Sequence, residues 1–112
     1  MNTEQNLLFI CSKNQWRSPT AEDLFSNHSY FKARSAGTSS KARIKVTEKV
    51  LHWAHVVLVM EKKHKELLYQ KFLATIQIKR VIVLNIPDKY KRNDPALISI
   101  LQQKLAAHGI EV

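Results

Sequence analysis

Cys11 and Arg17, separated by five residues, are the pair in this chain whose types and spacing could do chemistry. An apolar run over 7–10 precedes them, and Ser18 and Pro19 follow. This pattern predicts a buried strand, a tight loop and the start of a helix. In such a loop, successive backbone N–H groups can point inward and bind a dianion such as phosphate. The positive end of the helix adds to that attraction.

The two residues would have different tasks in such a loop. The planar guanidinium of Arg17 could hold two phosphate oxygens, and the positive field would stabilise Cys11 as a thiolate nucleophile. Taken singly, a cysteine after an apolar strand is more often a small buried hydrophobe, and an arginine in a basic chain is more often a surface charge. The apolar strand, Ser18 as the expected N-cap and Pro19 at the first helical position favour the phosphate-binding interpretation.

Size and composition indicate one domain over residues 1–112. The single cysteine excludes an internal disulfide, and the scattered histidines predict no metal site. The formal net charge of +9 favours anionic partners, but aromatics are few and no RNA-binding signature is present, so we expect no nucleic acid partner. The polar N-terminus and short apolar runs predict a cytoplasmic protein without a transmembrane segment.

Apolar runs alternate with amphipathic segments along the chain. Such alternation predicts an α/β fold, in which helices cover both faces of a parallel sheet. Ligands bind at the carboxyl ends of the strands in such sheets, where the loop after Cys11 and the segment after Leu84 both lie. The helix over 61–72 is basic, and we interpret it as a solvated face. Strands are expected over 7–10, 31–35, 55–60 and 80–84, and helices over 18–28, 47–54, 61–72 and 95–109.

Several short motifs resemble those of one known family. The residues at 8–11, 14, 17–19 and 21–22 resemble the signature of low-molecular-weight protein tyrosine phosphatases. Residues 34–38 (RSAGT) and 57–61 (VLVME) resemble two further segments of that family. The resemblance implies a single domain with a four-stranded parallel sheet of flavodoxin-like kind. It also implies phosphomonoester hydrolysis through a cysteinyl-phosphate, with neither a metal nor a cofactor.

By resemblance, three residues are catalytic: Cys11 as the nucleophile, Arg17 as the phosphate clamp and Asp88 as the general acid. The last helix aligns without a gap back to Asp88. Asp94 is the competing acid, because the pair Asp94-Pro95 looks like the family's Asp-Pro pair. We favour Asp88, since Asp94 is well placed as a helix N-cap and Asp88 follows the last strand, where a loop can lean over the phosphate site.

Three further residues match supporting positions of the family. Asn14 matches the residue that holds the loop in a strained conformation, and asparagine tolerates positive φ better than most residues. Ser18 matches the hydroxyl that hydrogen-bonds the thiolate, and Ser35 matches a serine that supports Asn14. The whole phosphate-binding set by resemblance is Ser12, Lys13, Asn14, Gln15, Trp16, Arg17 and Ser18.

The chain also departs from the family pattern. Lys13 replaces a usual glycine, and Trp16 replaces a small residue that is often a second cysteine. The segment between 37 and 47 is much shorter than usual and lacks the aromatic residue that walls the phosphotyrosine slot. We therefore expect a shallower, more open pocket with a basic rim made of Lys41, Arg43 and Lys45. Trp16 could stack on the substrate or only pack the loop.

The leading hypothesis is a cysteine-dependent phosphomonoester hydrolase, by resemblance a protein tyrosine phosphatase acting on phosphorylated protein. The basic rim suggests an alternative substrate class, namely small phosphorylated polyanions such as inositol phosphates or phosphoinositide headgroups. An arsenate reductase shares the fold but relays oxidation through further cysteines, and this chain has only Cys11. A non-catalytic phosphate-binding module remains, although binding alone needs neither the thiol nor Asp88.

Overall fold

A four-stranded parallel sheet forms the middle layer of the protein, which a computed structural model describes from residue 5 to residue 112. Its strands are β1 (Gln5–Cys11), β2 (Phe31–Gly37), β3 (Val56–Val59) and β4 (Arg80–Val83), in the spatial order β2-β1-β3-β4. Each neighbouring pair is parallel. The predicted α/β fold with a four-stranded parallel sheet is confirmed.

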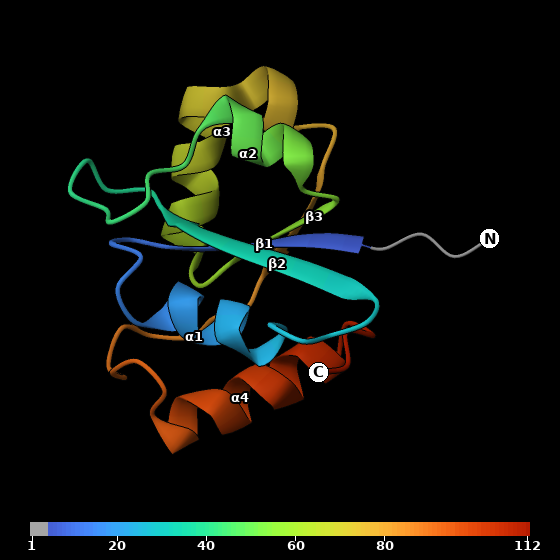
Figure 1. The fold of residues 1–112 in the computed structure, drawn as a ribbon. Coiled ribbons are helices and arrows are strands. Elements are labelled where there is room, and N and C mark those ends of the chain that lie inside the picture. Colours follow the sequence, from blue (N-terminus) through green and yellow to red (C-terminus); the bar gives the residue numbers. More distant parts are fainter. Residues whose placement is uncertain (1–4) are drawn as a thin grey trace.

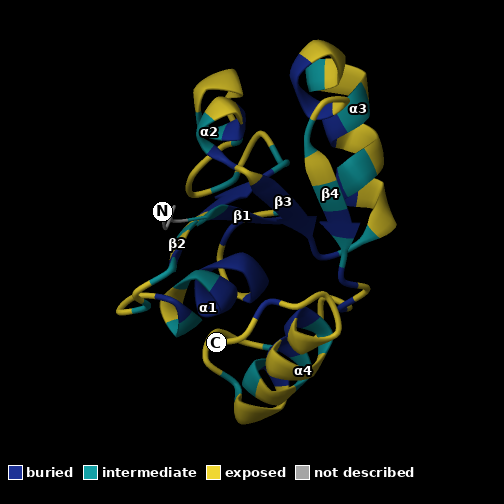
Figure 2. Ribbon diagram, turned by 90° about the vertical axis from the view of Figure 1, so that its right-hand side faces the viewer, coloured by how far each residue is buried: buried dark blue, intermediate teal, exposed yellow. Residues whose placement is uncertain are grey.

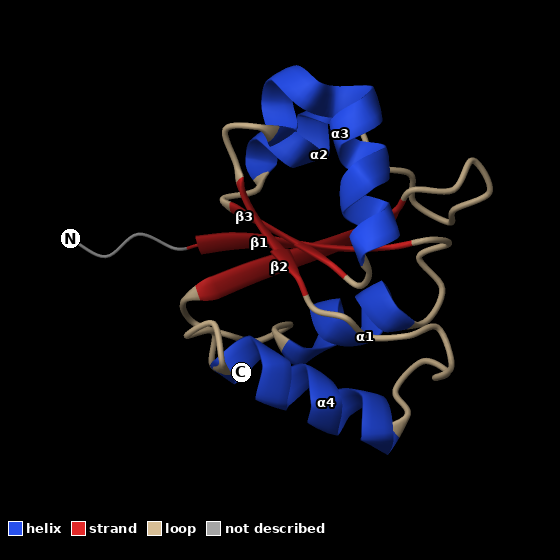
Figure 3. Cartoon of the chain, turned by 180° about the vertical axis from the view of Figure 1, so that it is seen from behind, coloured by secondary structure: helices blue, strands red, loops and turns tan. Residues whose placement is uncertain are grey.

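Two helices cover each face of the sheet. α1 (Arg17–Leu24) and α4 (Pro95–Ala106) lie below it in Figure 1, and α2 (Glu48–Trp53) and α3 (Lys62–Ile76) lie above it. Figure 3 shows the same three layers from behind. Because both faces of the sheet are covered, its strands can be apolar throughout, as the sequence indicated.

Alternate side chains of β1 enter two separate cores. Leu7 and Phe9 pack on the α1 and α4 side, and Leu8 and Ile10 pack on the α2 and α3 side. Figure 2 shows the central strands β1 and β3 as buried. Cys11 follows Phe9 by two residues and belongs to the core cluster on the α1 side. The strand period therefore directs the sulfur toward the start of α1.

Local capping signals start the helices α2 and α4 where the sequence predicted. Thr47 Oγ1 accepts a hydrogen bond from the backbone N–H of Val50 at 3.2 Å. Asp94 Oδ1 accepts one from Ala96 N–H at 2.8 Å, with proline at the first position of α4. Gly109, which has a φ of 77°, follows the end of α4.

The start and end of α1 differ from the prediction. The helix begins at Arg17 with Trp16 at the N-cap and no side-chain cap, so the prediction of Ser18 as the N-cap was wrong. Ser18 lies within the first turn and has other partners, described below. The helix ends at Leu24, well short of residue 28, since the serine and asparagine residues that follow are weaker helix formers.

The third helix is longer than predicted. α3 ends at Ile76, although the sequence indicated an end near Phe72. Phe72 has a φ of −133° and a ψ of 37°, which are not helical, so the helix continues beyond an interruption at the predicted end.

The loops that could hold a ligand gather at the carboxyl ends of the strands. The chain leaves β1 for β2 on one side and later returns to β3 on the other, so the strand order reverses beside β1. Ligands of open α/β sheets bind at such a point. In Figure 1 the loop after β1, the loop after β2 and the segment before α4 lie at the left edge. The sequence had placed its candidate site there.

Candidate active site

Cys11 lies at the floor of a small pocket. It is the last residue of β1, and its side chain is buried. The pocket has a volume of about 140 Å³ and is lined by Cys11, Ser12, Lys13, Gln15, Trp16, Arg17 and Asp88. The structure therefore brings together the three predicted catalytic residues. Of the predicted phosphate-binding set, Asn14 and Ser18 do not line the pocket but lie beneath it.

The sulfur of Cys11 has two hydrogen-bond partners. The backbone N–H of Asn14 donates to Sγ at 3.2 Å, and Ser18 Oγ lies 3.0 Å from Sγ. Asn14 Nδ2 donates to the same Ser18 oxygen at 2.9 Å. Because that oxygen already accepts, its own hydrogen is free for the sulfur. Toward a thiolate at Cys11, which can only accept, both partners act as donors, so the arrangement suits a negatively charged sulfur.

Asn14 ties the loop of residues 11–18, called the Cys11 loop below, to β2. It is buried and has a φ of 56°, in the left-handed region. Its Nδ2 donates to Ser35 Oγ at 2.8 Å, and Ser35 Oγ donates to Glu22 Oε1 at 2.5 Å. The structure thus places Asn14, Ser18 and Ser35 in one buried network, as the resemblance implied. Glu22, at its end, extends that network to α1.

The segment after β2 holds the outer side of the Cys11 loop. Backbone N–H groups of Thr38, Ser39 and Arg43 donate to the carbonyl oxygens of residues 11–13 at 3.0, 2.9 and 3.0 Å. Arg43 Nε donates to the carbonyl of Asn14 at 3.1 Å. In a planar trans peptide the C=O and the following N–H point in opposite directions. Four carbonyls held outward therefore turn the next four N–H groups toward the pocket.

Gly37 permits this close approach. A Cβ atom at this position would lie 2.4 Å from the carbonyl oxygen of Ser12, 2.7 Å from Ala42 Cβ and 3.0 Å from the backbone nitrogen of Asn14. Those separations are below van der Waals contact, so a larger residue would push the Cys11 loop away from β2. The glycine of the RSAGT motif is therefore explained by packing against this loop.

The prediction that the segment after Gly37 gives this pocket a basic rim is wrong. Lys41, Arg43 and Lys45 are not among the residues that line it. The short segment runs along the outer side of the Cys11 loop, where Arg43 binds the backbone. Lys45 instead lines a neighbouring pocket between this segment and α3. The basic side chains that line the pocket are instead those of Lys13 and Arg17.

Arg17 is oriented by two acceptors on one edge of its guanidinium. Its Nη1 donates to Glu61 Oε1 at 2.6 Å and to the carbonyl of Ile86 at 2.8 Å, and the side chain is only 2% exposed. Burial opposes ionisation of Glu61, but the hydrogen bond and charge of Arg17 outweigh it and hold the pKa of Glu61 below its usual value. The Nε atom, on the other edge, lies 3.7 Å from Asp88 Oδ1.

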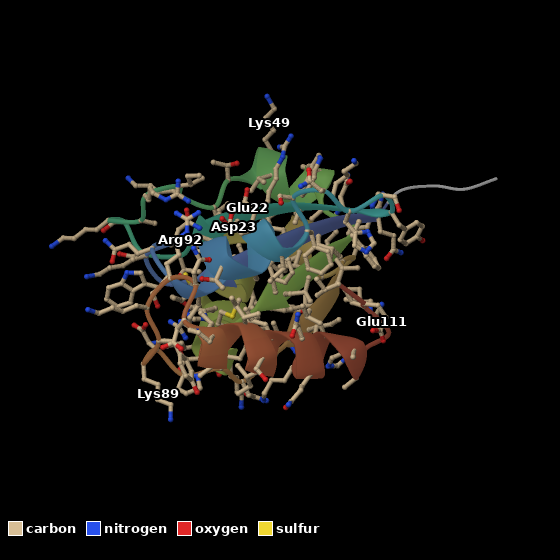
Figure 4. The ribbon with its side chains drawn as sticks, turned by 60° about the horizontal axis from the view of Figure 1, so that its bottom comes forward. Glu22, Asp23, Lys49, Lys89, Arg92 and Glu111 are labelled. Atoms are coloured by element: carbon tan, nitrogen blue, oxygen red, sulfur yellow. The ribbon has the colours of Figure 1, made fainter. Side chains whose placement is uncertain are left out.

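The two candidate acids have different positions. Asp88 lines the pocket and is 53% exposed, whereas Asp94 caps α4 and is absent from the pocket lining. The loop of residues 84–94, called the Asp88 loop below, is attached to α1 by an ion pair between Arg92 Nη2 and Asp23 Oδ2 at 2.8 Å. Figure 4 shows these two side chains at the surface, beside Glu22. The position of Asp88 in the pocket therefore favours it over Asp94 as the general acid.

His64 is a part of this region that sequence reasoning missed. We interpreted the helix around it as a solvated face, yet the His64 side chain is fully buried. Its Nε2 lies 2.9 Å from Ser12 Oγ, and its Nδ1 accepts the backbone N–H of Glu61 at 3.0 Å. Burial lowers the pKa of His64 to about 4, and the charge of Arg17 acts in the same direction. A histidine three residues after a helix N-cap was the available signal.

Within residues 5–112, no group of three or more His, Cys, Asp or Glu side chains is placed to hold a metal ion. No helix in that part of the chain is long and apolar enough to cross a membrane.

One protein-family model matches the N-terminal part of the chain, which contributes Cys11, Arg17 and Ser35 to the site. The model described as low molecular weight phosphotyrosine protein phosphatase matches residues 6–55, which include the Cys11 loop and Gly37. Over those residues the chain is similar to this family. Glu61, His64 and Asp88 lie beyond the matched residues. No curated protein sequence matches the chain.

Solved structures with the same fold include several phosphatases. The tyrosine phosphatase Wzb from Escherichia coli K30 in complex with phosphate has a TM-score of 0.74 and 21% identity, covering 95% of this chain and 96% of that one. Wzb from Vibrio vulnificus in complex with benzylphosphonate has a TM-score of 0.75 and 20% identity, and the match covers 95% of this chain and 97% of that one. The YwlE arginine phosphatase from Geobacillus stearothermophilus has a TM-score of 0.69 and 19% identity, and the match covers 93% of this chain and 92% of that one. These likenesses show that the chain shares its fold with these phosphatases over more than nine-tenths of its length.

Proposed function

We propose that this chain hydrolyses phosphomonoesters through a cysteinyl-phosphate intermediate formed on Cys11. The observation that carries the proposal is the surroundings of the sulfur. It lies at the pocket floor between the N–H of Asn14 and the hydroxyl of Ser18, and Asp88 lines the same pocket. A nucleophile, an anion site and an acid within one small pocket suit phosphoryl transfer.

In the first step the Cys11 thiolate attacks phosphorus in line with the leaving oxygen. The S–P bond forms and the P–O bond breaks, while the leaving oxygen takes the proton of Asp88. The inward N–H groups of the Cys11 loop and the Nε–Nη2 edge of Arg17 stabilise the phosphoryl oxygens. That edge is the one available, since Nη1 is already held by Glu61 and Ile86.

In the second step a water molecule attacks the cysteinyl-phosphate. Asp88, now a carboxylate, accepts the proton of the water, the S–P bond breaks, and inorganic phosphate forms. The departing thiolate is stabilised by the hydroxyl of Ser18 and the N–H of Asn14, the two donors that surround the sulfur. The protein returns to its starting state, and no step requires an additional group.

A phosphotyrosine side chain of a protein is the substrate that we propose. Trp16 lines the pocket and is 40% exposed, so its ring offers an aromatic surface to a substrate ring. The alternative of small polyanions has lost its main support, because the expected basic rim lies elsewhere. The arginine phosphatases among the structural neighbours make phosphoarginine a third substrate to test.

The test is the turnover of a chromogenic aryl phosphate in the presence of EDTA, with Cys11→Ser as the key variant. We expect turnover by the native chain and none by the variant, which should still bind phosphate through Arg17 and the loop N–H groups. Unchanged turnover in Cys11→Ser would overturn the mechanism. Phosphate binding without turnover by the native chain would instead identify a non-catalytic binding module.

The substrate is assigned by comparing kcat/KM for phosphotyrosine, phosphoserine and phosphoarginine peptides and an inositol phosphate. We expect the phosphotyrosine peptide to be preferred, and Trp16→Leu to reduce that preference more than it reduces phosphoserine turnover. Equal values for all substrates in both proteins would contradict a role of Trp16 in specificity.

A cytoplasmic location is part of the proposal. The lone Cys11 must remain a thiol to act as a nucleophile, and the cytoplasm keeps thiols reduced. Fractionation of cells that express the chain is the measurement, and recovery in an oxidising compartment would contradict it.

A further inference from the structure

The contact between Ser12 and His64 has no part in the mechanism proposed above. Ser12 follows the nucleophile directly and lines the pocket, whereas His64 is fully buried at the start of α3. Their side chains approach to 2.9 Å although they are 52 residues apart in the chain. A buried imidazole that reaches a pocket hydroxyl invites the question of which atom donates.

The hydrogen bond on the opposite side of the imidazole gives the answer. The backbone N–H of Glu61 is a donor only, and it points at His64 Nδ1 from 3.0 Å. Nδ1 must therefore carry its lone pair, and in the neutral ring the proton lies on Nε2. His64 remains neutral over the physiological pH range, because burial lowers its pKa to about 4. Nε2–H therefore donates to Ser12 Oγ.

This direction excludes one chemistry for the pair. A serine is activated as a nucleophile when a histidine nitrogen accepts its proton. Here the nitrogen that faces Ser12 already carries a proton, so His64 cannot act as that base. The hydroxyl hydrogen of Ser12 must point away from His64.

The pocket is where that hydrogen can go. Ser12 lines it, and the sulfur of Cys11 on the same floor already has two donors, from Asn14 and Ser18. A hydroxyl that accepts a hydrogen bond is polarised and becomes a better donor. An oxygen of a bound phosphoryl group is the acceptor that the pocket would supply.

We propose that the Ser12 hydroxyl donates a hydrogen bond to the phosphoryl group in the pocket, and that His64 is the positioning residue that orients it. The inference rests on the proposed function for its kinetic part. Its binding part needs only that the pocket holds a phosphate-like anion. It adds a side-chain donor to the backbone donors of the Cys11 loop, and it gives buried His64 a task in recognition.

Two single variants of the full chain separate the two residues. Ser12→Ala removes the donor. His64→Asn keeps an acceptor near the position of Nδ1 for the Glu61 N–H, and so keeps the start of α3, but it is too short to reach Ser12. His64→Gln is the matched control, because its amide can place a donor near the position of Nε2.

The measurements are vanadate affinity by calorimetry and kcat/KM for an aryl phosphate. A hydrogen bond to a charged group contributes enough that Ser12→Ala should weaken both by roughly 10- to 100-fold. We expect about 3- to 10-fold for His64→Asn, since the serine keeps its hydroxyl but loses its orientation. His64→Gln should recover part of that loss. Melting temperatures establish that each variant is folded.

The double variant Ser12→Ala with His64→Asn distinguishes positioning from a merely structural role. If His64 acts through Ser12, the double variant should lose no more than Ser12→Ala alone. Additive losses would overturn the positioning role, and a Ser12→Ala affinity within twofold of native would overturn the donor role. A native chain that binds vanadate without turnover would refute the proposed function, while the affinity measurements would still decide this inference.

Discussion

The Cys11 loop and the Asp88 loop meet at the same pocket but are held very differently. The Cys11 loop is bound on its inner side by the buried side chains of Asn14 and Ser18, and on its outer side by backbone donors from the segment after β2. The Asp88 loop is joined to α1 by the exposed ion pair of Arg92 and Asp23, by the Asn93 N–H that donates to Thr20 Oγ1, and by the hydrogen bond from Arg17 to the carbonyl of Ile86. Asp88 itself is half-exposed and lies 3.7 Å from Arg17 Nε. Nucleophilic attack and anion binding need a preformed geometry, whereas an acid must only reach the leaving oxygen.

The largest expected effect concerns the acid. Asp88→Asn should lower kcat by about 10²- to 10⁴-fold for phosphate esters with poor leaving groups, because general acid catalysis typically contributes that much. It should have much less effect on activated aryl phosphates, whose leaving groups need little protonation. The measurement is kcat across a series of leaving groups.

Asp94→Asn is the matched control for that series. Asparagine caps helices about as well as aspartate, so this variant should keep both its activity and its stability. A large loss of kcat in Asp94→Asn, with a nearly native Asp88→Asn, would transfer the acid to the start of α4.

The second prediction breaks the inner attachment of the Cys11 loop. Asn14→Ala loses two buried hydrogen bonds and puts alanine at a φ of 56°, so we expect the free energy of unfolding to fall by about 2–4 kcal/mol. Asn93 is an exposed residue with a φ of 63°, and Asn93→Ala should therefore cost only about 1–2 kcal/mol. Chemical denaturation measures both, and equal losses would show that the network adds nothing beyond backbone strain.

The third prediction breaks the outer attachment. Gly37→Ala should displace the Cys11 loop, costing about 1–3 kcal/mol of stability and a larger share of activity, because its Cβ would meet backbone. Gly109→Ala has only its φ of 77° against it and no atom within 4 Å, so it should leave kcat unchanged. Native activity in Gly37→Ala would mean that the loop tolerates displacement.

The smallest effect is expected at the exposed ion pair between Arg92 and Asp23, which joins the Asp88 loop to α1. Arg92→Ala removes an exposed ion pair, which typically contributes below about 1 kcal/mol, and its effect should shrink further in high salt. We expect kcat to change by less than threefold, and the reverse-charge pair Arg92→Asp with Asp23→Arg to restore it. A loss as large as that in Asp88→Asn would show that the two loops are held more alike than their contacts indicate.

Much of the fold and half of the site could be predicted from the sequence, because their signals are local. The apolar runs marked the strands, Thr47 and Asp94 marked two helix starts, and the spacing of Cys11 and Arg17 marked the loop between strand and helix. The capping role of Asp94 could also be predicted, since a residue that caps a helix is recognisable from its immediate neighbours. Such signals depend on residues a few positions apart.

Three features were decided only by the tertiary structure. Ser18 hydrogen-bonds with Asn14 and Cys11 and does not cap α1. The short segment after Gly37 packs behind the Cys11 loop and does not form a basic rim of the pocket. His64 is buried against Ser12. Each depends on contacts that form when β1, β2 and α3 are brought together, as the 52-residue separation of Ser12 and His64 illustrates. Residue types along the chain specify which elements form, whereas packing between distant elements determines which side chains meet.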